Sequence, residues 1–423
     1  MSKMIVITIL GMLILSGLGN IVIGYKSTEQ QIVIPKNHTK KVDLNNENFF
    51  DFLMKVIMKI SHYPSLVACI IKKDAVVWSN SYGLYDIEHQ KYATEDTIYR
   101  ICSITKTVTG TALMQLYEKG YFELDDDIND YLIFNCRNPN FPDKSITFRM
   151  LLSHSSSVNG SPDSFYWFNF SGDPPFSFYP YPWIQEYIDP EGGYYDPLIW
   201  SDQYGPGEGA RYSNANFVLI AHLVELLSGE SFIEYCREHI FQPLQMYNTS
   251  FNLSEFDIDN VAIPYHYDFL RYYKINETPS YLPIYNYESA YYRTLHYPAG
   301  GIYSTLSDIS HLLIAHMNGG VYDGVRILEE ATVDEMHKNQ PPNLGFGLAW
   351  YYTNGRYRGI ASGHEGDAAG LHSAMLVEYP ENDIGILYFV NGDRYSSEGT
   401  IGSNLIRNLL FHKSDNLSKE MQL

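Results

Sequence analysis

The stretch "YRICSITKTVTGTALM", Tyr99–Met114, places a serine three residues before a lysine at the start of an otherwise apolar run. The run predicts a buried helix, in which Ser103 and Lys106 share one face with Cβ atoms roughly 5–6 Å apart. A serine hydroxyl is a weak nucleophile until a neighbouring base takes its proton, and burial favours the neutral amine of a lysine. The pair could therefore be a nucleophile and its base, although the spacing alone also fits a helical serine beside a surface lysine.

Two further motifs follow in a set order, Tyr212-Ser213-Asn214 and His364-Glu365-Gly366. With Ser103-Ile104-Thr105-Lys106 they resemble the three separated motifs of the serine β-lactamase and penicillin-binding protein superfamily. The likeness is greatest to the branch of class C β-lactamases, D-alanyl-D-alanine carboxypeptidases and related esterases. It runs from about residue 50 to 412 and includes two intervening phrases, "MLLSHSSSV" (Met150–Val158) and "YPAGGIYSTLSDISHLL" (Tyr297–Leu313).

The resemblance implies a role for each matching residue. Ser103 would be the acylated nucleophile, and Lys106 would share its proton. Tyr212 would act as general base for acylation and protonate the leaving group, while Asn214 would orient the substrate or Lys106. Because a free tyrosine has a pKa near 10, a phenolate needs cationic neighbours, and Lys106 and a protonated His364 are the candidates.

The same resemblance implies an oxyanion hole made by two backbone N–H groups. These belong to Ser103 and to Asp367, which directly follows Gly366 on a predicted strand; such donors stabilise the charge that develops in acyl transfer. The glycine-rich setting of His364 favours the edge of a strand, and a zinc helix of the His-Glu-x-x-His type is excluded because position 368 is Ala368. His154 is interpreted as a hydrogen-bonded turn residue.

Glu365 and Asp367 flank the third motif, where the superfamily commonly carries groups that bind a substrate carboxylate. Two carboxylates there would repel an anionic substrate, so we expect an esterase, amidase or peptidase for a neutral or cationic substrate. Two alternatives stay open. One is a true β-lactamase or D,D-carboxypeptidase, and the other is a catalytically silent binding or assembly protein on the same scaffold.

The order of predicted elements indicates a mixed α and β fold. A helix at Asn46–Ser61 and a hairpin over "SLVACIIKKDAVVWSNSYG" (Ser65–Gly83) precede helices that end at Gly120 and Gly229. Strands return at "FGLAWYY", "GLHSAMLVEY" and "DIGILYFVNG", followed by a helix at "IGSNLIRNLLFH". We therefore expect a β-lactamase/transpeptidase-like fold, an antiparallel sheet flanked by helices, with an inserted helical domain.

This pattern predicts the domain boundaries. Residues 161–204 form a loop rich in aromatic residues, which is interpreted either as a lining of the substrate site or as a layer packed on the helical domain. The predicted segments are a signal peptide or anchor (1–24), a linker (25–44), a discontinuous α/β domain (45–100 and 296–412), an inserted mostly helical domain (101–295) containing the aromatic-rich loop (161–204), and a C-terminal tail (413–423).

The N-terminal segment begins with Lys3 and an apolar run from Met4 to about Leu18, which is typical of a secretory signal peptide. Because apolar residues resume at Ile21, an uncleaved membrane anchor is the alternative. Either reading predicts a secreted or membrane-anchored, extracytoplasmic protein. Glycosylation sequons agree with export; they begin at Asn37, Asn159, Asn169, Asn248, Asn252, Asn276 and Asn416.

Composition narrows the range of molecules that the protein is expected to bind. A formal net charge of -20 disfavours nucleic acid and anionic membrane surfaces, so a small molecule or peptide is the expected substrate. The four cysteines are too scattered for a zinc site or a disulfide framework, which leaves buried thiols or one or two bridges. Walker, dinucleotide and Gly-x-Ser-x-Gly motifs are absent from the sequence, so no cofactor is expected. The oligomeric state is not indicated.

Overall fold

The computed structural model describes residues 47–159, 183–193, 195–268, 270–275, 296–355, 359–378, 383–394 and 396–420. The predicted signal segment and linker lie outside these ranges, as does most of the aromatic-rich loop. Within them, seven strands form one sheet in the order β10-β11-β12-β13-β1-β2-β3, and every neighbouring pair is antiparallel. The strands are β1 (Ser65–Lys72), β2 (Ala75–Asp86), β3 (Lys91–Tyr92), β10 (Tyr351–Gly355), β11 (Gly359–Ala368), β12 (Leu371–Glu378) and β13 (Ile384–Val390).

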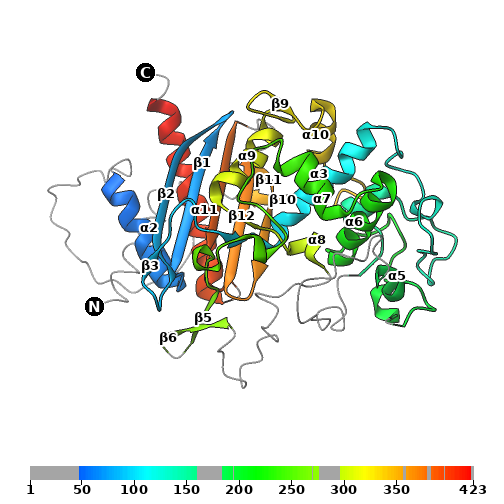
Figure 1. Cartoon of the computed structure of the whole chain (residues 1–423), viewed down its shortest axis with the longest axis horizontal. Helices are drawn as coiled ribbons and strands as arrows, with labels where there is room; N and C mark the ends of the chain where they lie inside the picture. Colours follow the sequence, from blue (N-terminus) through cyan, green and yellow to red (C-terminus); the bar gives the residue numbers. More distant parts are fainter. Residues whose placement is uncertain are drawn as a thin grey trace, which may run out of the picture. The chain divides into compact units, whose positions relative to one another are not determined.

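Helices cover both faces of the sheet (Figure 1). On β13, Tyr388 reaches Ser403 of α11 (Ser397–Glu420) with 2.8 Å between their hydroxyl oxygens. The adjacent residue Leu387 belongs to the hydrophobic core shared with α9 (Leu306–Met317). Since adjacent residues of a strand point to opposite faces, α11 and α9 lie on opposite sides. Burial on both faces explains why the central strands are almost wholly apolar.

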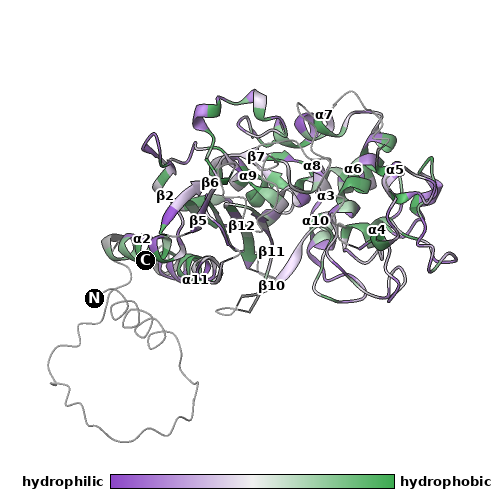
Figure 2. Ribbon diagram, turned by 90° about the horizontal axis from the view of Figure 1, so that it is seen from below, coloured by the Kyte–Doolittle hydropathy of each residue, from purple (hydrophilic) through white to green (hydrophobic). Residues whose placement is uncertain are grey.

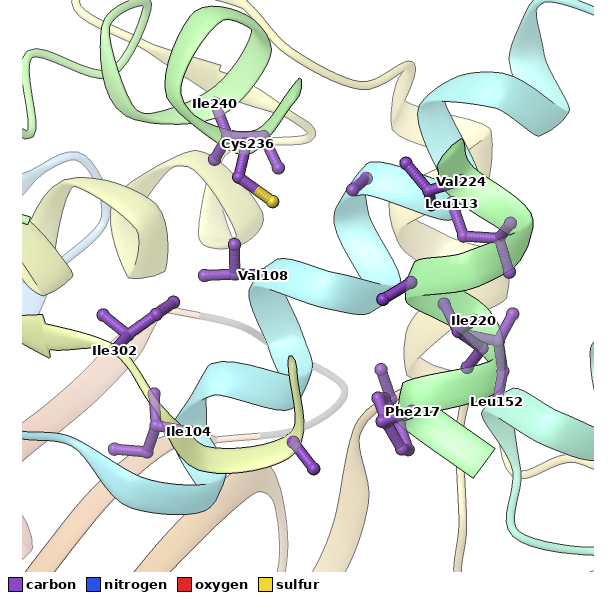
Figure 3. Close-up of a cluster of buried hydrophobic side chains, with 14 of the residues drawn as sticks. Ile104, Val108, Leu113, Leu152, Phe217, Ile220, Val224, Cys236, Ile240 and Ile302 are labelled. Atoms are coloured by element: carbon purple, nitrogen blue, oxygen red, sulfur yellow. The ribbon is translucent and has the colours of Figure 1, made fainter. Parts of the chain in front are cut away.

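Helix α3 (Thr105–Glu118) is the centre of the helical region, with Thr105–Leu116 buried at every position. It packs on α6 (Asn214–Ser228), which is hydrophobic along most of its length (Figure 2), and on α8 (Tyr297–Gly300). Figure 3 shows Leu113 of α3 beside Val224 of α6, whereas Val108 points toward Ile302 and Cys236. The predicted C-terminal glycines are confirmed: Gly120 and Gly229 have φ of 74° and 78°, the left-handed conformation that glycine adopts without steric cost.

The predicted helix at Asn46–Ser61 is confirmed as α2 (Glu47–Ser61), and the hairpin as β1 and β2. Three details differ. The predicted strand at "FGLAWYY" begins only at Tyr351, because Ala349 has a φ of 65° that breaks an extended chain. The last helix continues through Glu420, so residues predicted as a tail are helical. β11 is an inner strand in the sheet order, but its pairing with β10 ends at Gly363, so only the part from His364 onward lies at an open edge.

Strands from both ends of the chain share the sheet, and the described region after residue 100 is largely helical up to β10. The predicted domain boundaries stay a prediction. Among the described residues no single helix is long and apolar enough to cross a membrane, and one sharply bent pair, α6 with residues Phe232–Phe241, passes by length and composition only. The turn that carries Ser103 is η1 (Cys102–Ile104). The remaining strands and α-helices of the described residues are β4 (Tyr99–Arg100), α4 (Phe148–Leu152), α5 (Trp183–Ile188), α7 (Phe232–Cys236), β5 (Tyr265–Asp268), β6 (Arg271–Lys274), β7 (Tyr303–Ser304), β8 (Val321–Tyr322), β9 (Val325–Arg326) and α10 (Glu330–His337).

Candidate active site

The candidate nucleophile lies in a strained turn at the start of α3. Ser103 is half-buried in the 3-10 turn η1, and Cys102 before it has a φ of 50°. A left-handed conformation costs a non-glycine residue about 1–2 kcal/mol and persists only where the surroundings enforce it. Here Ile101 donates its N–H to Ile302 O at 2.9 Å, and its carbonyl accepts from Ser373 Oγ at 2.7 Å. Distant segments therefore fix the serine in place.

The Lys106 amine is aimed at this serine. Its Nζ lies 3.0 Å from Ser103 Oγ and donates to the carbonyl of Ala299 at 2.6 Å. The side chain is 0% exposed, and this burial holds the pKa of Lys106 well below its usual value. A depressed pKa makes the neutral amine available as a base near neutral pH. The surface-lysine alternative is thus excluded by the structure.

Tyr212 lies over the amine, with Lys106 Nζ 4.9 Å from its ring centroid. The loop that carries it is held by His154 on both sides of the tyrosine. Arg211 donates its backbone N–H to the His154 carbonyl at 2.9 Å, and Ser213 donates its own to His154 Nδ1 at 3.0 Å. The imidazole also packs on the Tyr212 ring, with centroids 4.5 Å apart. The prediction that His154 is a hydrogen-bonded turn residue is confirmed.

Asn214 is the first residue of α6, two positions after Tyr212. Its Oδ1 is buried and has no hydrogen-bond partner within the described part of the chain. A buried acceptor without a partner costs about 1–3 kcal/mol, so an N–H donor from a bound molecule would relieve it. The hydrogen bonds of Lys106 go to Ser103 and Ala299 and not to Asn214, so the other suggested role of Asn214, which is to orient the substrate, stays a prediction.

His364 completes the group from β11. Its ring centroid lies 6.0 Å from that of Tyr212, and its Nδ1 lies 2.8 Å from the carbonyl oxygen of Glu365, so that nitrogen carries the proton and donates. Burial lowers the pKa of His364 to about 3. The imidazole is therefore neutral at neutral pH. This corrects the expectation that a protonated His364 stabilises a Tyr212 phenolate.

The backbone after His364 faces the nucleophile turn. A Cβ on Gly366 would lie 2.4 Å from Ile101 O and 2.9 Å from Cys102 Cβ, so only glycine allows this approach. β10 pairs with β11 no further than Gly363, and Glu365 instead donates its N–H to the Tyr351 hydroxyl at 2.8 Å. Residues two apart in a strand point their N–H groups the same way. The Asp367 N–H therefore points to the side that β10 leaves open.

The carboxylates of Glu365 and Asp367 extend to the opposite face of β11 from His364 and Gly366. Arg394 bridges them, 3.0 Å from Glu365 and 2.9 Å from Asp367, and Arg407 lies 3.4 Å from Glu365. Burial alone would raise the pKa of Asp367, but hydrogen bonds from His372 and Arg394 outweigh it and keep that pKa low. This corrects the argument that two bare carboxylates would repel an anionic substrate, because both are neutralised and turned away.

Other sequence-level expectations have mixed outcomes. All four cysteines are buried and free, so the alternative of one or two bridges is wrong. Among the described residues, Glu230, Glu238 and His239 place three ligand atoms within 4.8 Å of one another, but none of them belongs to the site around Ser103. The expected lack of a cofactor stays a prediction. No local sequence pattern pointed to Tyr351 or Arg394, because each contacts β11 only in the folded protein.

The antiparallel sheet, the helical region and a Ser-x-x-Lys pair at the base of a buried helix define a β-lactamase/transpeptidase-like fold. The chain belongs to the β-lactamase family, described as "Beta-lactamase", whose family model matches residues 50–410. The family resemblance drawn from the sequence is thereby confirmed.

Individual relatives are distant. Penicillin-binding protein 4* of Bacillus subtilis (strain 168) is 25% identical over 324 residues, 75% of this chain. The chain spans 65% of that relative's length. Among solved structures, the octameric penicillin-binding protein homologue from Pyrococcus abyssi has a TM-score of 0.69 at 23% identity, covering 87% of this chain and 78% of the other. D-amino acid amidase from Ochrobactrum anthropi SV3 has a TM-score of 0.65 at 22% identity, covering 89% and 100%. These two likenesses show the fold.

Proposed function

We propose that the protein is a serine hydrolase that works through an acyl-enzyme on Ser103. The observation that carries this proposal is the 3.0 Å contact between Ser103 Oγ and the amine of fully buried Lys106. An amine with a depressed pKa, within hydrogen-bond distance of a hydroxyl, satisfies the geometric and electrostatic requirements of a general base.

The proposed proton path begins at Ser103 and ends at the leaving group. Lys106 accepts the hydroxyl proton as Ser103 attacks the carbonyl carbon. Tyr212, directly over the amine, relays that proton to the departing oxygen or nitrogen. A neutral phenol suits this relay, because the neutral His364 provides no positive charge to hold a phenolate. The function of general base, which the family resemblance gave to Tyr212, thus moves to Lys106 in this proposal.

The oxyanion would lie between the N–H groups of Ser103 and Asp367. Ser103 is in the first turn before α3, where backbone N–H groups lack helical partners, and Asp367 has its N–H on the open side of β11. Removal of one such donor in known acyl-transfer enzymes costs about 10²–10³ in kcat. We assign this position to the carbonyl oxygen of the scissile bond.

The substrate we propose is an ester or amide, including a short peptide, whose acyl side is neutral or cationic. Two observations support it. The unpartnered Oδ1 of Asn214 can accept an N–H from an amide, and the side chains packed around Lys106 and Tyr212 are the uncharged His154, Phe217 and His364. The fold likeness to D-amino acid amidase is in keeping with an amino-acid amide as one such substrate.

A fluorophosphonate probe followed by a substrate panel tests the proposal. The purified protein should form a covalent adduct that peptide mass spectrometry locates on Ser103, and Ser103→Ala should form none. The panel contains short-chain p-nitrophenyl esters, amino-acid amides of both configurations, and nitrocefin. Turnover of esters or amides that Ser103→Ala abolishes supports the proposal.

The rival functions give different outcomes. A catalytically silent binding or assembly protein would form no adduct and turn over nothing in the panel. A true β-lactamase would hydrolyse nitrocefin with a kcat/KM far above that for the esters and amides. Glu365 and Asp367 are both paired with Arg394, so their charges do not argue against a substrate that carries a carboxylate. The nitrocefin measurement therefore decides between a β-lactamase and an esterase or amidase.

We also propose that the protein acts outside the cytoplasm, attached to the membrane or released according to whether the N-terminal segment is cleaved. The apolar leader and the sequons support this location. Asn248 is exposed and so accessible for glycosylation, whereas the Asn159 side chain donates to Leu198 O at 3.2 Å. The N-terminal residue and glycan map of protein from a eukaryotic secretory host test the proposal. An unmodified Asn248 together with retention in the cytosol would contradict it.

A further inference from the structure

The strand that carries the proposed oxyanion donor is held on its opposite face by a half-buried cluster of charged groups. Arg394, in the segment after β13, places one guanidinium nitrogen 3.0 Å from Glu365 and the other 2.9 Å from Asp367. The guanidinium side chain is 24% exposed, and the two carboxylates are 10% and 21% exposed. A planar fork of donors that joins two neighbouring carboxylates on one strand is a geometry that arginine makes and lysine does not.

Asp367 is held from a second direction by His372 on β12. His372 Nδ1 lies 2.9 Å from Asp367 Oδ1 and 3.2 Å from the carbonyl oxygen of Gly366. The other ring nitrogen of His372 lies 2.9 Å from Ser403 Oγ on α11. The side chain of Asp367 is thus held directly by Arg394 and His372, and His372 links it to α11.

The near face of the same strand is pressed on the nucleophile turn. Gly366 lies so close to Ile101 and Cys102 that a Cβ there would meet their atoms at 2.4 Å and 2.9 Å. The Gly366–Asp367 peptide is therefore confined between the Ser103 turn on one side and the Arg394 fork on the other. Since the N–H of Asp367 belongs to this peptide, its distance from Ser103 depends on both contacts.

We propose that Arg394 is a positioning residue, which sets the Asp367 N–H at the distance from Ser103 that the oxyanion requires. This inference rests on the proposed acyl-transfer function. Arg394 lies on the face of β11 opposite to His364 and Gly366, so it would act through the strand and not by touching the substrate. Displacing a catalytic group by about 1 Å can lower a rate by about 10²-fold. Loss of the fork should therefore lower kcat and leave KM nearly unchanged, because the donor acts on the oxyanion more than on the bound substrate.

The test uses two variants that weaken the fork and one matched control in the full-length protein. Arg394→Lys keeps the charge but not the bidentate geometry, and Asp367→Asn keeps the backbone N–H but loses the ion pair. Arg407→Met is the control, since Arg407 contacts Glu365 at 3.4 Å from α11 and leaves the contacts of Asp367 intact. Active sites are counted by stoichiometric fluorophosphonate labelling, so that partial misfolding does not count as lost rate.

We expect kcat per active site on a p-nitrophenyl ester to fall about 10-fold to 100-fold in Arg394→Lys and in Asp367→Asn, with KM within about threefold of wild type. The control should retain kcat within about threefold. Amide hydrogen exchange gives a readout that needs no activity: peptides covering residues 364–368 should exchange faster in Arg394→Lys, and those covering 371–378 should not.

Two kinetic results would overturn the inference. One is an unchanged kcat in Arg394→Lys, and the other is an equal loss in Arg394→Lys and Arg407→Met, which would mean general stabilisation only. Unchanged exchange at 364–368 would also count against it. A wild-type protein that neither labels nor turns over any substrate would instead refute the proposed function, and the exchange measurement would still decide whether Arg394 holds the strand.

Discussion

The Nζ atom of Lys106 donates a hydrogen bond to the carbonyl oxygen of Ala299 at 2.6 Å. The two residues are 193 positions apart in the chain, and the bond joins the nucleophile helix α3 to the Pro298-Ala299-Gly300-Gly301 segment. Thr109 on the same helix makes a parallel contact, donating its hydroxyl to Pro298 O at 2.6 Å. One proton of the amine is thus committed to a backbone carbonyl, which leaves two positions at the nitrogen for the second proton and the lone pair and so limits how the lone pair can face Ser103.

We expect Lys106→Met to lower kcat/KM for an ester substrate by about 10²–10⁴-fold, the usual contribution of a positioned general base. Methionine fills a similar volume without a basic atom, so the fold should persist. Because burial depresses the pKa of Lys106, folding disfavours the charged amine, and its removal should not lower the thermal midpoint at pH 7. Steady-state kinetics and thermal unfolding, with Lys119→Met at the exposed end of α3 as control, check both points. Retention of wild-type kcat/KM would exclude Lys106 as the base.

Gly366→Ala should be both destabilising and inactivating. The added Cβ would lie 2.4 Å from a backbone oxygen of the nucleophile turn, which cannot rotate away as a side chain could. Overpacking of this kind costs about 1–3 kcal/mol, and here the strain would push β11 away from Ser103. Urea unfolding and the fluorophosphonate labelling rate measure the two effects. Gly193→Ala is the control, since its Cβ would meet only a flexible Glu186 oxygen at 3.4 Å.

His154→Phe tests the support of the Tyr212 loop. Phenylalanine preserves the ring packing but leaves the Ser213 N–H without its acceptor, which should cost about 1–3 kcal/mol of unfolding free energy. Less restraint on Tyr212 should lower kcat by about 10-fold with a smaller change in KM. The matched control is His222→Phe in α6, because both ring nitrogens of His222 are buried without a hydrogen-bond partner among the described residues. If both variants lost kcat equally, the assigned role of His154 would be wrong.

Stability should fall steeply on mild acidification. Burial lowers the pKa of His296, His316 and His364 to about 3 and that of His222 to about 4, against 6.5 for an exposed histidine. Between these values the unfolded chain binds protons that the folded protein does not, so the stability present above pH 6.5 is lost as the pH drops. Each group contributes at most about 1.4 kcal/mol per pH unit in this window. Urea unfolding at pH 7.5, 6 and 5 measures the slope, which His222→Phe should reduce. A flat profile from pH 7.5 to 5 would show that these histidines are not buried as described.

The sequence by itself determined the elements whose cause is local. Helical spacing after Ser103, the left-handed glycines at Gly120 and Gly229, and the polar turn between two β-rich runs each depend on neighbours a few residues away. The order of the three motifs also identified the family, because motif order can be read along the chain without knowing which residues touch in the folded protein.

The tertiary structure decided what depends on burial and on distant partners. His364 is neutral because the folded chain removes it from water, and no feature of "SGHEGD" carries that information. Glu365 and Asp367 are neutralised by Arg394 and Arg407, which lie on later segments, so the sequence alone suggested a repulsion that the fold abolishes. Solvation and ion pairing are set by all the atoms around a group, and only folding brings those atoms together.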